Sequence, residues 1–272
     1  MRSLLAHALA VVAAVALPTA QTQEPALDHV LRAVGGYLGA YEQNLAIVGQ
    51  EDYLQQISTA RRTLRSDILF MQDDVFGWVE FRDVAESDGV SVRDREARLL
   101  ALFTKPNPDR LKQAQRIVAE GARFNLDPAE IRLNRTINLP LTALRFLRAA
   151  EQHRSSFRVV EWDRQTDLVT LTFVEQRRPR LIGTPDQSAC RGQFEIDRVS
   201  GRVVASRLTV QSGRTFATIV VKFSHDGKIG IWLPRSMEEQ YSGAFSGFIR
   251  GLAHYSHYRQ FRVETHTDIG RH

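Results

Sequence analysis

The histidines near the end of the chain are the residues whose type best suits metal binding. His254 and His257 lie three residues apart in a segment that we expect to form a strand, and His225 and His266 lie elsewhere. Histidine is a common metal ligand, but residues three apart on a strand point to opposite faces, so this pair could share a metal only across a bulge or bend. We therefore expect no metal site and no cofactor.

Candidate nucleophiles lack the partners that catalysis needs. The chain has no G-x-S-x-G elbow, and the segment 242–247 is better interpreted as a flexible loop. Arg191 could lower the pKa of Cys190, the single cysteine, but no partner histidine is specified. The carboxylate pairs Asp73-Asp74 and Glu238-Glu239 are adjacent in sequence and expected to be solvated. A catalytic residue is therefore not predicted, and a hydrolase without a recognisable motif is the least favoured function.

The densest basic cluster is the candidate anion contact. Arg177, Arg178 and Arg180 directly follow an apolar strand that ends at Val174. Guanidinium groups match the geometry of phosphate, so a phospholipid headgroup or an acidic partner would suit them. The alternative is a solvated hairpin tip.

Five large apolar side chains on separate candidate strands are the candidate cavity lining. Such residues most often fill a core, but a sheet that curves into a half-barrel could leave a cavity on its concave face. The five residues are Trp78, Phe81, Trp162, Phe173 and Trp232.

Helical patterns dominate the first half of the chain. Apolar residues from Leu27 to Val48 recur at steps of three and four, which predicts one long amphipathic helix or two shorter ones. A second helix is predicted from Asp109 to Glu120, with Gly121 as its stop, and a short third one after Asn138, which would cap it.

Strand patterns dominate the second half. Extended runs are already present around residues 64–70 and 78–84, and Ser87-Asp88-Gly89 is typical of a hairpin. Within residues 216–223 alternate side chains are apolar, as in a half-buried antiparallel strand, and an Asp-Gly pair at 226–227 predicts a tight turn after it. The later strands are expected at 157–162, 168–175, 193–197, 202–210, 216–223, 229–233 and 255–265.

Because helical patterns come first in the chain and hairpins later, the sequence predicts an α+β fold. We expect a curved antiparallel sheet that forms an open half-barrel, with the N-terminal and central helices packed on one face. This layout resembles the periplasmic lipoprotein-carrier class with the LolA/LppX-like fold, and the segments 94–100, 135–140 and 251–261 look like pieces of an uncharacterised exported family of that general type. The resemblance implies an apolar cavity for acyl chains under the helices. It implies no catalytic residues, because the class has no invariant catalytic set.

The first residues predict export. Arg2 precedes an apolar run from Leu4 to Leu17, which at about 1.5 Å per helical residue spans roughly 21 Å and is shorter than the ~30 Å of a bilayer core. We therefore expect a signal peptide of residues 1–20, cleaved after Ala20 or alternatively after Ala16, and a single domain of residues 21–272. No cysteine follows the run to accept a lipid, so the expected location is the periplasm or the medium, without a permanent membrane span.

Composition restricts the partners and the source of stability. The net charge of +5 comes from 36 basic residues scattered among 31 acidic ones, so nucleic acid is not an expected partner. One cysteine allows no intramolecular disulfide, so the fold must be stable by its core alone. The function expected is an exported, non-enzymatic protein that binds a lipid or acyl chain. The alternative is a structural or protein-interaction module of the cell envelope that binds no such ligand.

Overall fold

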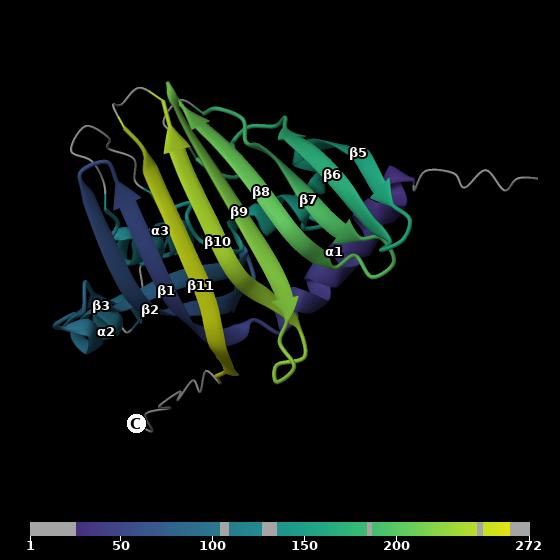
Figure 1. The fold of residues 1–272 in the computed structure, drawn as a ribbon. Helices are drawn as coiled ribbons and strands as arrows, with labels where there is room; N and C mark the ends of the chain where they lie inside the picture. Colours follow the sequence, from purple (N-terminus) through teal and green to yellow (C-terminus); the bar gives the residue numbers. More distant parts are fainter. Residues whose placement is uncertain (1–25, 104–108, 127–134, 184–186, 244–246, 262–272) are drawn as a thin grey trace, which may run out of the picture.

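The described part of the chain contains an open sheet of eleven antiparallel strands, in the order β4-β3-β2-β1-β11-β10-β9-β8-β7-β6-β5. The computed structural model describes residues 26–103, 109–126, 135–183, 187–243 and 247–261, and Figure 1 shows the sheet as strongly twisted and curved. The expected antiparallel, unclosed sheet is therefore confirmed. The predicted signal peptide and the end of the last predicted strand lie outside the described residues.

The elements are bounded as follows. The helices are α1 (Leu27–Gln43), α2 (Arg95–Phe103), α3 (Arg110–Ala122) and the 3-10 helices η1 (Thr142–Leu147) and η2 (Gln152–Arg154). The strands are β1 (Ala46–Ile57), β2 (Ala60–Asp73), β3 (Gly77–Ser87), β4 (Val90–Ser91), β5 (Ser155–Asp163), β6 (Leu168–Glu175), β7 (Arg191–Asp197), β8 (Val203–Ser212), β9 (Thr215–His225), β10 (Trp232–Ser242) and β11 (Ile249–Gln260).

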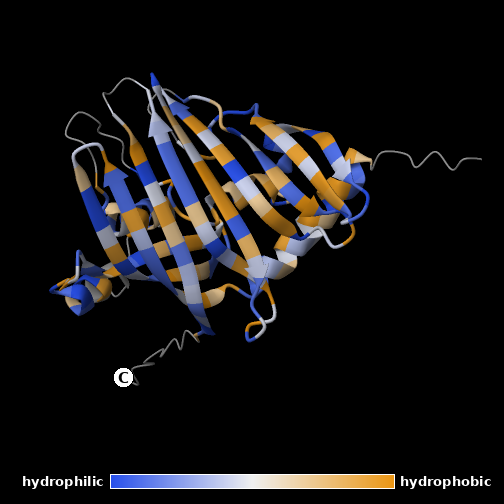
Figure 2. Ribbon diagram, in the orientation of Figure 1, coloured by the Kyte–Doolittle hydropathy of each residue, from blue (hydrophilic) through white to orange (hydrophobic). Residues whose placement is uncertain are grey.

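Alternate residues along each strand point to the two faces of the sheet, and Figure 2 shows the resulting alternation of hydrophilic and hydrophobic positions. We call the face that carries α1 and η1 the inner face, and the opposite one the outer face. In β9 the inner set Ala217, Ile219, Val221 and Phe223 is buried, whereas Lys222 on the outer face is exposed, as the sequence pattern predicts. The main core therefore lies between the inner face and α1.

The buried side of α1 comprises Val30, Val34, Leu38 and Tyr41. Its backbone approaches the turn between β7 and β8 so closely that a Cβ on Gly201 would lie 2.2 Å from the Ala33 carbonyl group. Two polar contacts add to this apolar packing. The Gln152 side chain donates to the Leu31 carbonyl oxygen at 2.9 Å. Arg148 pairs with Glu42 at 2.6 Å.

The prediction that the first helix extends to Val48 is wrong, because α1 ends at Gln43 and β1 begins at Ala46. The whole of β1 was missed as a strand. Its inward positions include Glu51 and Gln55, which break the apolar alternation that identifies a strand, and both are fully buried. Pairing with β2 on one side and β11 on the other decides the conformation of this segment.

Two smaller helix predictions also need correction. Gly121 does not end α3 but lies within it, where the absence of a side chain lets the helix pack against the Arg82 backbone. Asn138 does not cap η1, whose first turn follows Leu141, because the Asn138 side chain takes part in a buried network described below. Asp109 does cap α3, accepting from the backbone amides of Leu111 and Lys112.

The helices do not all share one face. Ile117 of α3 and Leu99 of α2 pack with Val79 and Phe81, which point outward from β3, in a second, smaller apolar cluster. The expectation of helices on one face therefore describes α1 and η1, whereas α2 and α3 cover the β3 end of the sheet.

The turn between β9 and β10 is longer than the tight hairpin predicted from the Asp-Gly pair. Asp226 accepts from the backbone amides of Lys228 and Ile229, and Gly230 has a positive φ of 81°. Strand β10 consequently begins at Trp232, so residues 229–231 are wrongly predicted as strand.

We expect Gly201→Ala to destabilise the protein by more than about 2 kcal/mol, because the new Cβ would meet α1 backbone at a residue with a φ of 72°. The control is Gly213→Ala, since Gly213 has a φ of 57° with nothing near its Cβ position, and a loss of only about 1 kcal/mol is expected. Urea unfolding measures both. Equal losses would contradict close packing of α1 on the β7–β8 turn.

Candidate functional site

The five predicted cavity-lining residues do not gather at one place. Trp78 and Phe173 are buried in the main core, whereas Phe81 belongs to the cluster under α3. Trp162 and Trp232 are half-buried. Arg164 and Arg198 lie over the Trp162 ring at 5.1 and 5.6 Å, and Arg202 lies over the Trp232 ring at 4.3 Å. A shared cavity lined by all five residues remains a prediction.

Phe173 instead forms the centre of an aromatic cluster at the β5 end of the inner face. Its ring lies 4.5 Å from Phe146 of η1, 5.2 Å from Phe194 of β7 and 6.2 Å from Phe157 of β5, centroid to centroid. Phe157 is only half-buried and lies on β5, the edge strand of the sheet. We call Phe146, Phe157, Phe173 and Phe194 the edge aromatic cluster.

The predicted anion contact lies directly after β6, which carries Phe173. Arg177 and Arg178 are exposed, whereas the Arg180 guanidinium donates to the carbonyl oxygens of Glu175, Arg177 and Gln187 and so supports the loop. Two of the three arginines therefore present their guanidinium groups to solvent. Their role in binding an anion remains a prediction.

His254 and His257 lie on β11, whereas Cys190 lies just before β7. His254 is exposed, and His257 lies where the β1–β11 register shifts, with a positive φ of 52°. No group of three metal-binding side chains exists among the residues that the structure describes. Burial, together with nearby Glu175, raises the pKa of the Cys190 thiol to about 12, which makes it a poor nucleophile.

The sequence did not reveal the largest polar arrangement, which is buried under the inner face. Its first part is an ion pair between Glu51 of β1 and Arg82 of β3, with nitrogen–oxygen distances of 2.5 and 2.9 Å and both side chains at most 1% exposed. Burial opposes the charge on Arg82, but Glu51 outweighs it and raises the Arg82 pKa further above its usual range. The Arg82 guanidinium also donates to the Asn138 carbonyl oxygen at 2.8 Å.

The second part is an ion pair between Arg135 and Glu239 of β10, and neither side chain is exposed. Arg135 also donates to the Gln55 side chain at 3.0 Å and to the Leu126 carbonyl oxygen at 2.9 Å. The Tyr241 hydroxyl donates to Glu239 at 3.0 Å.

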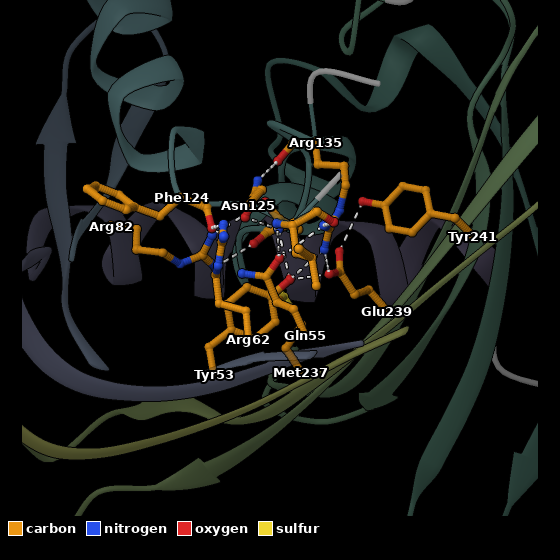
Figure 3. A network of polar contacts seen from close by, with 12 residues as sticks. Tyr53, Gln55, Arg62, Arg82, Phe124, Asn125, Arg135, Met237, Glu239 and Tyr241 are labelled. Atoms are coloured by element: carbon orange, nitrogen blue, oxygen red, sulfur yellow. Dashed lines mark hydrogen bonds and ion pairs between the residues drawn. The ribbon is translucent and has the colours of Figure 1, made fainter. Parts of the chain in front are cut away.

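Tyr53 joins the two ion pairs. Its ring lies 4.7 Å below the Arg82 guanidinium, and its hydroxyl donates to Glu239 while accepting from Arg135 and Asn138, each at 3.0 Å. Figure 3 shows Arg82 and Arg135 on either side of Tyr53 and Gln55. We call the set Tyr53, Glu51, Gln55, Arg82, Arg135, Asn138 and Glu239 the buried network.

The network connects distant parts of the chain. It joins β1, β3 and β10 to the described residues 125–126 and 135–138, and Gly251 of β11 leaves room for it, since a Cβ there would lie 2.4 Å from Glu239. A signal existed in the sequence: Glu51, Tyr53 and Gln55 alternate with Asp52 and Leu54, but only assignment of β1 as a strand reveals them as inward residues.

Glu80 of β3 is a buried carboxyl group without an ion-pair partner within 4 Å in the described part of the chain. It accepts from the Leu141 backbone amide at 2.7 Å and so positions the start of η1. Burial raises its pKa to about 7, although nearby Arg145 and the Leu141 amide counteract the shift. The protonated form is therefore the one that the fold favours.

The larger of the two hollows described lies on the outer face and measures about 580 Å³. Side chains of five neighbouring strands, β1 and β8 to β11, surround it, and none of the five predicted cavity residues does. The second lies between β3, α3 and residues 136–139 and has no space for even a water molecule. The residues lining the outer hollow include Leu54, Arg207, Val220, Glu238, Arg250 and Leu252.

Comparison with known proteins yields structural likeness only. No protein-family model and no curated protein sequence matches the chain. One similar solved structure is a putative outer membrane lipoprotein-sorting protein domain from Vibrio parahaemolyticus, with 9% identity, a TM-score of 0.41 and coverage of 86% of this chain and 95% of that one. Another is a DUF1329 family protein from Desulfovibrio piger, with 10% identity, a TM-score of 0.46 and coverage of 89% and 95%.

A lipoprotein-sorting domain is thus among the similar structures. The likeness is distant and concerns the overall arrangement of strands and helices. Within the described residues, no helix combines the length and the apolar character needed to cross a membrane.

We expect Arg82→Met to lower the free energy of unfolding by about 3–5 kcal/mol, because it leaves Glu51 buried without a counter-charge. Glu51→Leu combined with Arg82→Met should recover most of that loss, since no uncompensated charge remains. Urea unfolding of the two single variants and the double variant tests this. A double variant as unstable as the sum of the single ones would contradict the interpretation.

Glu80 should make stability depend on pH. Its pKa is raised from 4.5 to about 7 on folding, so its contribution is fully present below pH 4.5 and lost as the pH rises through about 7. The loss should be on the order of 3 kcal/mol, and Glu80→Gln should remove this part of the pH dependence. Unfolding both proteins at pH 5 and pH 8 measures the difference, and equal slopes would exclude Glu80 as the cause.

Proposed function

We propose that the chain is an exported, non-enzymatic protein that binds an anionic amphiphile, with the acyl chain against the edge aromatic cluster and the charged head at Arg177 and Arg178. The observation that carries this proposal is the position of the cluster, which begins at the half-buried Phe157 on the open edge of the sheet. Export rests on the signal peptide predicted at residues 1–20.

The distance between Phe173 and the exposed arginines suits a ligand with an apolar chain and a charged head. Phe173 lies four residues before Arg177, which is at most about 13 Å along the chain, so an acyl chain on the cluster would place its head near the two exposed arginines. A phosphate or carboxylate head would there form charge-assisted hydrogen bonds with guanidinium groups that face solvent.

Access requires that the side chains now in contact with the cluster move. The cluster and the inner side of α1 belong to the same apolar core, and α1 is held by the Glu42–Arg148 ion pair and by the Gln152 hydrogen bond to Leu31. An acyl chain would replace part of the contact area of α1. The buried network at the other end of the inner face would remain in place, because separating its ion pairs would leave buried charges without a partner.

A second candidate function, an interaction module of the cell envelope, is supported by a different observation. The larger described hollow lies on the outer face, away from α1 and the aromatic cluster. A protein that used only this face would need no acyl chain.

Phe157→Asp should abolish binding of a fluorescent fatty-acyl probe, because it places a carboxylate at the entrance to the edge aromatic cluster. The matched control is Val174→Asp, which puts the same charge on the outer face of the adjacent strand β6 and should leave binding within twofold of the unchanged protein. Native mass spectrometry of the protein purified from its own host should also detect a bound amphiphile. A ligand-free mass together with no probe binding would exclude the carrier function.

Arg177→Glu combined with Arg178→Glu should weaken a probe with a phosphate head by roughly tenfold while leaving an uncharged acyl probe unaffected, since only the first has a charge for the arginines to contact. Equal effects on the two probes would contradict a headgroup contact.

A further inference from the structure

The outer hollow combines an apolar floor with charges of both signs. Leu54, Leu252, Glu238, Val220 and Arg207 are consecutive cross-strand neighbours on β1, β11, β10, β9 and β8, so they form one row across the outer face. The leucines and Val220 are half-buried and expose enough apolar surface to contact a ligand. The volume of about 580 Å³ is within the range of binding pockets.

The charged groups of the hollow are not neutralised within the protein. Across the residues that the structure describes, Arg207, Glu238 and Arg250 form no ion pair, and the Arg250 guanidinium lies over the Phe248 ring, at 5.2 Å. Exposed arginine and glutamate side chains on a sheet commonly pair with their cross-strand neighbours, but here the residues directly opposite are uncharged. They are Gln193 and Val220 for Arg207, Val220 and Leu252 for Glu238, and Gln56 and Gln240 for Arg250. The three charges are thus available to a partner.

The charges of Arg250, Glu238 and Arg207 follow one another across the strands in the order positive, negative, positive. Arg250 is a diagonal neighbour of Glu238 across β11 and β10, about 7–8 Å away, and Arg207 is two strands beyond Glu238, about 10 Å away. A uniformly anionic ligand would be repelled by Glu238, and a uniformly cationic one by both arginines. The complementary ligand carries charges in the order negative, positive, negative.

An extended peptide supplies this order at a similar spacing. Its residues i, i+2 and i+4 point to one side and lie about 7 Å apart, and the long arginine and glutamate side chains accommodate the remaining difference. We propose that the outer hollow binds an extended peptide segment of a partner protein with the charge pattern acidic-x-basic-x-acidic on one side. This inference extends the second candidate function by naming the partner, and it does not depend on acyl binding.

The test uses synthetic peptides and charge reversal. A fluorescent peptide with Glu-Ser-Lys-Ser-Glu flanked by valines should bind the whole protein, and the reversed peptide Lys-Ser-Glu-Ser-Lys should bind at least tenfold more weakly. Arg207→Glu should weaken the first peptide roughly fivefold, as expected for one exposed ion pair lost. Arg158→Glu, which makes the same charge change at an exposed position of the edge strand β5 away from the hollow, is the matched control and should have no effect.

The decisive variant combines Arg207→Glu, Glu238→Lys and Arg250→Glu. All three positions are exposed, so the fold should tolerate them, and circular dichroism verifies this. The triple variant should prefer the reversed peptide over the original one. Absence of peptide binding up to 1 mM, or a preference unchanged in the triple variant, would overturn the proposal. A third outcome would also overturn it: the protein binds anionic phospholipid vesicles but no peptide, and Arg207→Glu abolishes the vesicle binding. That result would assign the surface to a membrane.

The fatty-acyl probe should bind the triple variant as it binds the unchanged protein. Failure of the peptide test therefore leaves the carrier function intact, and failure of the acyl test leaves this proposal intact.

Discussion

Two ion pairs buried on the same side of an open sheet are the constraint on which the rest of the structure depends. Glu51–Arg82 and Arg135–Glu239 have almost no solvent contact, and Tyr53 links them through its ring and its hydroxyl. Taking such charges out of water costs several kcal/mol for each ion, and the cost is offset only if each partner is held in place. The network therefore fixes the distances between β1, β3, β10 and the segment that carries Arg135.

This constraint divides the inner face into two parts of different character. At the β3 end, polar groups hold one another by directed hydrogen bonds, and displacement of any member leaves a buried charge without a partner. At the β5 end, aromatic rings and the apolar side of α1 make non-directional contacts, which other apolar groups can replace at little cost. A hydrophobic ligand is thus compatible with the β5 end and incompatible with the β3 end, which is the physical basis of the proposed acyl site.

The outer face differs from the inner one because, among the described residues, no helix covers it between β1 and β8. Its residues remain largely hydrated, so charges such as Arg207, Glu238 and Arg250 carry no desolvation cost and need no internal partner. The two faces of one sheet can therefore serve two separate interactions. The period of two along each strand keeps them independent, since a substitution on one face does not project into the other.

The sequence by itself determined those features that depend on local pattern. They are the α+β class, most strands from β5 onward, the helix that begins after Asp109 and the inward set of β9. It also suggested Phe173, Arg177 and Arg178 as candidate site residues, but not the contacts of Phe173 with Phe146 and Phe157. Only the tertiary structure decided that residues 46–57 form a central strand and that Arg82 and Arg135 are buried. It also showed that Asn138 joins a hydrogen-bond network and that Gly121 allows close packing, instead of marking helix ends. The reason is that an arginine or glutamate considered alone is predicted to lie at the surface. Its burial is stable only when an oppositely charged partner is brought into contact, and these partners are 31 positions apart for Arg82 and Glu51 and 104 for Arg135 and Glu239.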